Sequence, residues 1–148
     1  MTRLYHETAV VGRVRGFQVG NAAGSDSDLE QVYSYTASGR FETLTSERLS
    51  TPSTARTFRY TYLSGSALLN SLSIDGSHPF TITRVYDGSR DLVTSLETRW
   101  GSNPGNLLAG YAYTYDERGQ RSTVVQSGAV FADYGEDTSQ QFAYDGRG

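Results

Sequence analysis

The 148-residue sequence contains no cysteine and no lysine, and it has only two histidines, three prolines and one tryptophan. Without cysteine there is no disulfide scaffold and no cysteine-ligated metal site. Without lysine there is no phosphate-binding loop that ends in Gly-Lys-Ser or Gly-Lys-Thr. All 13 basic residues are arginine, and 16 acidic residues outnumber them to give a net charge of −3. This balance provides no general attraction to a phosphate backbone, so we expect no nucleic-acid partner.

Long apolar runs are absent as well. The amino terminus carries Arg3 and Glu7 where a secretory signal peptide would need a continuous apolar stretch. The two longest uncharged windows, 60–74 and 100–115, are interrupted by Ser, Asn, Gly or Thr well short of the roughly 18 apolar residues of a membrane helix. We therefore expect no membrane insertion.

What the sequence has instead is a mixture typical of strands and turns, with 18 Ser, 16 Thr, 11 Tyr and six Phe. Aromatic or aliphatic residues alternate with polar ones in the segments 58–62, 68–74, 80–86 and 111–115, which predicts half-buried strands. The segment 92–100 also fits a helical spacing. We predict a strand there because it is rich in β-branched residues and has glycines close to both ends.

Turn signals separate these segments at fairly even intervals, which predicts a meander of antiparallel hairpins with about ten strands. They lie at 37–40, 64–66, 75–77, 87–89, 103–106 and 116–119. Residues 1–29 form a less regular lead-in. We expect one domain over residues 1–148, forming a curved sheet or part of a β-shell.

An internal repeat carries the most information about function. Its units are anchored by Tyr35, Tyr62, Tyr86, Tyr115 and Tyr144, at spacings of 27, 24, 29 and 29 residues. Such spacings suit a repeat made of one supersecondary unit, here two strands and two turns. In the full signature an aromatic residue ends a strand, an Asp is expected to accept hydrogen bonds from the turn backbone, and a Gly to supply a positive φ. We expect that positive φ at Gly119.

At these residues the sequence resembles the YD-repeat family, also called Rhs repeats, whose pattern is Tyr-Asp-x-x-Gly. The segments 115–119 and 144–148 match it in full. The other units depart from it, because Thr36 and Leu63 stand in place of Asp, Gly65 comes one place early, and Arg90 replaces the turn Gly. The signature residues are Tyr35, Gly39, Tyr62, Gly65, Tyr86, Asp87, Tyr115, Asp116, Gly119, Tyr144, Asp145 and Gly148.

This resemblance implies a strip of β-hairpins that spirals into a shell, as in bacterial Rhs toxins, insecticidal toxin complexes and teneurins. In that family the shell encloses or displays a separate domain, and the repeats are scaffold. The resemblance thus implies a non-catalytic structural or interaction module of a cell-surface or secreted protein. Its partner would be the remainder of a longer YD-repeat polypeptide.

Candidate catalytic and metal-binding residues are few. His6 and His78 are the only imidazoles, and no Gly-x-Ser-x-Gly or His-Glu-x-x-His motif is present. His78 lies in a turn segment, and we interpret both histidines as surface residues. The alternating acids at 26–30 suggest a calcium loop, but Gln31 stands at the glycine position and no acidic residue stands at the closing twelfth position, so we interpret the segment as a solvated loop. We expect no catalytic residue, no cofactor and no metal.

An alternative function is carbohydrate binding. Exposed tyrosine rows on a flat sheet can stack against sugar rings, with neighbouring Arg, Asn and Asp side chains as hydrogen-bonding groups. Core packing of the same rows is the competing interpretation, and we favour it because the tyrosines recur at one point of each hairpin. A glycoside hydrolase with paired carboxylates is a third, weaker possibility, since the acidic residues lie mostly in turns.

The last expectation concerns residues 140–144, which carry no charge. Gly148 ends the final turn signature without a returning strand, so we expect a fragment whose last strand is an open edge. Such an edge either frays after about Ser139 or associates with another edge, and Phe142→Lys should favour the monomer.

Overall fold

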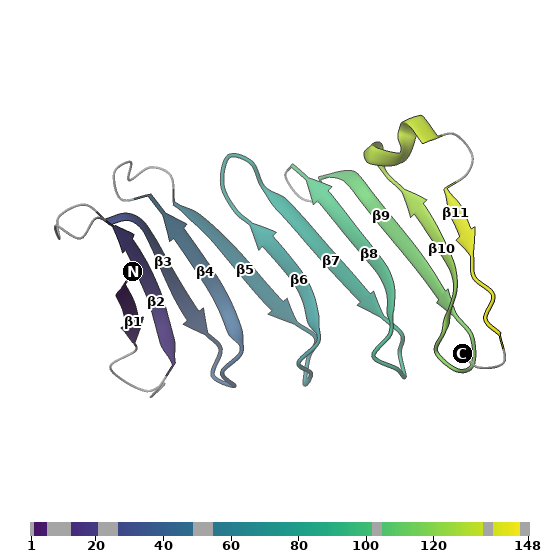
Figure 1. Cartoon of the computed structure of the whole chain (residues 1–148), viewed down its shortest axis with the longest axis horizontal. Helices are drawn as coiled ribbons and strands as arrows, with labels where there is room; N and C mark the ends of the chain where they lie inside the picture. The colour runs from purple at the N-terminus through teal and green to yellow at the C-terminus, as the bar shows by residue number, and fades with distance from the viewer. Residues whose placement is uncertain are drawn as a thin grey trace. The chain divides into compact units, whose positions relative to one another are not determined.

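The computed structural model describes residues 2–5, 13–20, 27–48, 55–101, 105–134 and 138–145. These residues form eleven strands and one short 3₁₀ helix, η2 (Figure 1). Their bounds are β1 Thr2–Tyr5, β2 Val14–Gly20, β3 Ser27–Tyr35, β4 Phe41–Glu47, β5 Arg56–Tyr62, β6 Leu69–Ile74, β7 Phe80–Tyr86, β8 Val93–Trp100, β9 Asn106–Tyr115, β10 Arg121–Ser127, η2 Ala129–Tyr134 and β11 Ser139–Gln141.

The strands follow one another in the sheet in sequence order, β1 to β11, and each described pair is antiparallel. The predicted all-β antiparallel meander is therefore confirmed, as is the strand predicted at 92–100, which is β8. One expectation was wrong, because residues 27–30 begin β3 rather than a loop. The lead-in 1–29 contains β1, β2 and the start of β3.

The described chain divides into two compact units. Unit 1 comprises residues 1–61 and 73–77, and unit 2 comprises 62–72 and 78–148. A single domain over the whole chain stays a prediction.

In unit 1 the two faces of the sheet differ in chemistry. Residues directly opposite on neighbouring strands share a face, and the register places Tyr33 opposite Leu44. On that face the ring of Tyr33 lies 6.4 Å from the ring of Phe17 and 5.3 Å from that of Phe41, centroid to centroid. On the other face the hydroxyls of Ser34 and Thr43 lie 2.7 Å apart. One face is therefore aromatic and the other hydroxyl-rich.

Unit 2 has the same division. The register places Tyr113 of β9 opposite Val124 of β10, and the rings of Tyr111 and Tyr113 lie parallel with centroids 6.3 Å apart. On the other face the hydroxyls of Thr114 and Thr123 lie 2.7 Å apart. The predicted alternation in 111–115 thus places its three tyrosines on one face.

Apolar burial is scarce. Among the described hydrophobic residues only Val124 is buried, at 5% exposure. The large apolar side chains that are exposed include Phe41, Val85, Trp100 and Val125. A single layer of strands exposes both of its faces, and the described residues contribute no second layer. The sheet therefore depends on its backbone ladder, its cross-strand pairs and its turns.

The helix η2 was not expected from the sequence. Its Phe131 packs edge to face against Tyr111, with ring centroids 5.6 Å apart. It has no acidic residue in its first turn and no basic residue in its last, so the usual sequence signals of a helix are missing. Within the described segments, no helix has the length and apolar character needed to cross a membrane.

Candidate functional site

The signature tyrosines stand where strands end. Tyr35, Tyr62, Tyr86 and Tyr115 are the last residues of β3, β5, β7 and β9, and Tyr144 lies shortly after β11. A recurring hydrogen bond runs from the tyrosine hydroxyl to the backbone carbonyl of the first residue of the preceding strand. The pairs are Tyr35 to Val14 at 2.7 Å, Tyr86 to Leu69 at 2.9 Å, Tyr115 to Val93 at 2.5 Å and Tyr144 to Arg121 at 2.9 Å.

We call this contact the tyrosine clasp. The two strands that it joins are connected to each other at their far end, so the clasp closes the open end of the same hairpin. It also gives a partner to the carbonyl at the start of a strand, where the ladder of hydrogen bonds begins. Phenylalanine would supply the ring but not the donor. The repeated use of Tyr at these anchors is therefore explained by the clasp.

Sequence reasoning identified the tyrosines but missed the clasp. The acceptor is a backbone carbonyl, and the residues that provide it are Val, Leu, Val and Arg, which share no side-chain chemistry. The one available signal was the preference for Tyr over Phe at the anchor positions.

We expect Tyr115→Phe to lower the free energy of unfolding by about 1–2 kcal/mol, because the carbonyl of Val93 loses its partner. Tyr111→Phe is the matched control, since Tyr111 lies on the same strand and face and takes part in no clasp. Urea denaturation measures both. Equal changes in the two variants would contradict a specific role for the hydroxyl of Tyr115.

Two of the turns that follow the tyrosines are alike. The turns 36–40 and 116–120 both close with a bond from the first N–H to the last carbonyl. Gly39 has φ 81° and Gly119 has φ 80°, so the positive φ expected at Gly119 is found. Asp116 Oδ1 accepts from the N–H of Gln120 at 2.8 Å, and Thr36 Oγ1 accepts from that of Arg40 at 3.1 Å. Thr36 therefore accepts the same closing hydrogen bond as Asp116.

The two other described turns, 63–68 and 87–92, are one residue longer. In the first, Gly65 has φ 69°. In the second, Asp87 Oδ1 accepts from the backbone N–H groups of Ser89 and Arg90, at 3.0 and 3.1 Å. The early Gly65 and the missing turn glycine at Arg90 thus accompany a different turn length rather than a lost turn.

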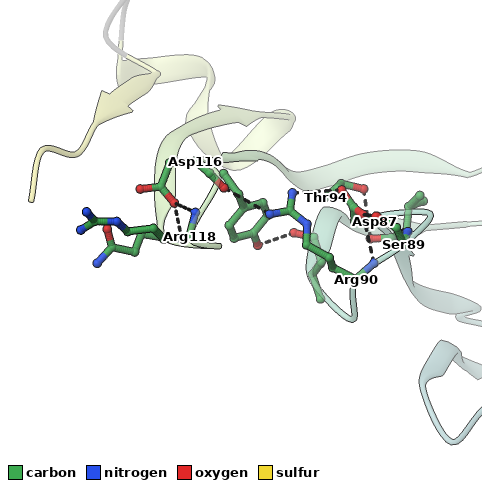
Figure 2. Close-up of polar contacts among 10 residues, drawn as sticks. Asp87, Ser89, Arg90, Thr94, Asp116 and Arg118 are labelled. Atoms are coloured by element: carbon green, nitrogen blue, oxygen red, sulfur yellow. Dashed lines mark hydrogen bonds and ion pairs between the residues drawn. The ribbon is translucent and has the colours of Figure 1, made fainter. Parts of the chain in front are cut away.

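An arginine links neighbouring turns in unit 2. Arg90 makes an ion pair with Asp87 at 3.2 Å, and its other terminal nitrogen donates to the carbonyl of Asp116 at 3.2 Å. Figure 2 shows Arg90 reaching from its own turn to the next, and Figure 1 places the turns after β7 and β9 at the same edge. In unit 1, Arg13 donates to the carbonyl of Gly39, and its guanidinium lies 5.2 Å from the ring of Tyr35.

The hydrogen bonds around Asp87 affect its ionisation. The N–H of Ser89, followed by the side chains of Arg90 and Ser89, lowers the pKa of the Asp87 carboxyl from 3.8 to about 2. The ionised carboxylate is thus the form that the folded turn favours.

We expect the free energy of unfolding to decrease as the pH falls from about 5 toward 2, in part because Asp87 becomes protonated. Since the folded pKa lies below the ordinary 3.8, the stabilising contribution is present above pH 3.8 and is lost as the pH falls through about 2. Denaturation at a series of pH values measures this. Asp87→Asn should flatten the dependence more than Asp91→Asn, which removes an exposed carboxyl from the same turn. Identical profiles for the two variants would exclude a role for Asp87.

Of the remaining sequence candidates, the structure describes His78, Glu30 and Asp145. His78 is exposed, and its ring centroid lies 5.9 Å from that of Trp100. Glu30 accepts a hydrogen bond from Gln18 at 2.8 Å. His6 and Gly148 lie outside the described residues, and Asp145 follows Tyr144 in an exposed position. No group of three potential metal ligands occurs among the residues that were described.

The tyrosine rows are half-buried rather than open platforms. The Arg121 guanidinium lies 4.3 Å from the centroid of the Tyr113 ring and covers it. Burial raises the pKa of Tyr113, although Arg121 opposes this effect. Burial also raises the pKa of Tyr33, with the neighbouring tyrosines Tyr35 and Tyr60 adding to the shift. Tyr144 is more open, at 47% exposure.

Fold and site together define a class of structure: an antiparallel β-meander whose hairpins are closed by tyrosine clasps and joined by short polar turns. Comparison with models of known protein families gives no match, and comparison with curated proteins gives none either.

Proposed function

We propose that the chain is a non-catalytic structural and interaction module, a segment of a YD-repeat shell that encloses or displays a separate domain of a surface or secreted protein. The observation that carries this proposal is the tyrosine clasp, which recurs in four hairpins. A ligand site needs one constellation at one place. A contact repeated in several hairpins serves the architecture of an array in which each unit supports its neighbours.

The turn chemistry supports the same proposal. The carboxylates of Asp87 and Asp116 accept backbone N–H groups of their own turns. The guanidiniums of Arg13 and Arg90 reach turn carbonyls in the next hairpin. These polar groups are occupied in holding the chain, which leaves them less available for a substrate.

One side chain on the aromatic face of unit 2 supports an interaction role. Arg84 lies opposite Leu96, and Leu96 lies opposite Tyr111, so the three share a face. The Nη1 atom of Arg84 is shielded from solvent and has no acceptor in the described segments. A buried donor without an acceptor is costly, and a covering element with a carbonyl or carboxylate would satisfy it.

Carbohydrate binding is less well supported. The ring of Tyr113 is covered by Arg121, and that of Tyr111 is flanked by Phe131. Trp100 is an exposed indole, at 43% exposure, whose ring lies 5.9 Å from that of His78, so it could stack on a sugar ring. It therefore serves as the test residue for this alternative.

The experiment is a titration of the whole chain with a panel of glycans, followed by NMR or calorimetry, together with assays for hydrolase and transferase activity. We expect neither saturable binding nor turnover. Tyr111→Ala should lower stability, whereas Trp100→Ala should leave the fold intact. Saturable binding that Trp100→Ala abolishes would favour the sugar-binding alternative, and turnover lost in His78→Ala would overturn the non-catalytic assignment.

A further inference from the structure

β11 is the last strand in the order of the sheet, so only one of its two sides pairs with a described strand. On its inner side β11 pairs with β10, with Gln140 opposite Val124. The flanking bonds run from the N–H of Gln126 to the carbonyl of Thr138 at 2.6 Å and from the N–H of Phe142 to the carbonyl of Ser122 at 2.9 Å. They extend the pairing beyond the three residues of β11 on both sides.

The same bonds fix which backbone groups face outward. Thr138 and Phe142 direct their groups toward β10, and backbone groups alternate in direction along an antiparallel strand. The N–H and C=O groups of Ser139, Gln141 and Ala143 therefore point away from β10. β11 is the last strand in the sheet order, so no described strand pairs with these groups.

Nothing in the side chains of this edge opposes pairing with another strand. Residues 138–144 carry no charge and no proline, the two features that most often protect a sheet edge. Phe142 and Tyr144 are 41% and 47% exposed. The edge of β11 can therefore form backbone hydrogen bonds with a further strand.

We propose that two copies of the chain associate through β11, antiparallel and around a two-fold axis at Gln141. In this register Gln141 faces its own counterpart and Ser139 faces the Ala143 of the other copy. An antiparallel pair of identical strands satisfies both copies equally, which is the condition for a closed dimer. The outward groups then form about six backbone hydrogen bonds between the copies.

A second copy fits this edge better than a charged or proline-rich segment because the edge offers only backbone groups and uncharged side chains. In the symmetric register Phe142 lies opposite the Gln140 of the other copy, and the two Phe142 rings are diagonal neighbours on one face. Diagonal aromatic pairs across an antiparallel ladder are within contact distance. The dimer thus covers part of an exposed ring without a new charge pair. This inference concerns self-association and goes beyond the proposed function.

The first test is sedimentation of the full chain from micromolar to near-millimolar concentration, compared with Gln141→Pro. The N–H of Gln141 points outward, so proline removes a donor that β10 does not use. We expect the wild type to dimerise and the variant to dissociate at least about tenfold more readily, with its unfolding midpoint unchanged at low concentration. Gln140→Pro is the matched control, because it removes an inward N–H and should lower the midpoint.

The second test reads the register directly. The chain has no cysteine, so a single introduced thiol has no competitor. Gln141→Cys places two thiols on directly opposed residues, about 5.5 Å apart at Cα, which a disulfide can span. Ser139→Cys places them four residues out of register, roughly 13 Å apart. Mild oxidation should cross-link the first variant and spare the second.

Three results would overturn the proposal. One is a wild type that stays monomeric over the whole concentration range. Another is a dimer that Gln141→Pro leaves intact, which would place the interface elsewhere. The third is cross-linking of Ser139→Cys as fast as that of Gln141→Cys, which would contradict the two-fold register.

Discussion

Gly16→Ala is expected to disrupt the pairing of β2 with β3 and to lower the free energy of unfolding by about 3 kcal/mol or more. A Cβ atom at Gly16 would stand 2.0 Å from the carbonyl oxygen of Gln31 and 3.2 Å from the Cα of Val32. Both are backbone atoms of the neighbouring strand, held in register with β2. They cannot rotate away as a flexible side chain would, so the strands must separate.

Gly88→Ala is the matched control for this prediction. A Cβ at Gly88 meets nothing within 4 Å, and Gly88 is not among the described glycines with positive φ. We expect a change within about 0.5 kcal/mol there. Urea denaturation with hydrogen exchange on β2 and β3 measures both variants. Wild-type stability and protected β2 amides in Gly16→Ala would contradict the prediction, because they would show that β2 and β3 do not approach each other as closely as these distances require.

Val124→Asp is the second substitution with a large expected effect, a loss of about 3 kcal/mol. Val124 is the one buried hydrophobic residue of the described chain, and it lies between Tyr113 on β9 and Gln140 on β11. A carboxylate at this position would lose its hydration and gain neither an ion pair nor a hydrogen bond in exchange. The loss should shrink as the pH is lowered, because protonation removes the buried charge.

Val125→Asp supplies the comparison. Val125 is the next residue on β10, so its side chain points to the opposite face, where it is 44% exposed. The introduced carboxylate stays in water there, and we expect a loss of less than about 1 kcal/mol. Thermal and chemical unfolding at neutral and acid pH measure both variants. Equal losses would mean that the two faces of β10 do not differ in burial.

Period-two alternation was enough to predict the meander because most strands have one aromatic and one polar face. It did not indicate β2, where Arg15 interrupts the pattern and aromatic alternation is missing. The turn residues Gly39 and Gly119 were predictable because a positive φ leaves a trace in residue type.

Contacts made by backbone groups could not be predicted in this way, because they do not depend on residue type. The clasp acceptors at Val14 and Val93 are carbonyls, which every residue has. The sequence did not show that Thr36 and Asp116 are equivalent, because they are different residue types. Each nevertheless has a side-chain oxygen that accepts a hydrogen bond from the backbone N–H four residues later. Sequence patterns predict which residues are needed, but not which backbone atoms they meet.

The tyrosine clasp has a further consequence for how such chains can diverge. The donor and the acceptor are separated by 17 residues in one hairpin and by 21, 22 and 23 in the others, yet the bond is the same. The length of the connection at the far end of a hairpin is therefore decoupled from the closure at the near end. The connection between β10 and β11 already contains η2. Insertions should accumulate at the far ends, where new loops can be added without altering the spacing of the sheet.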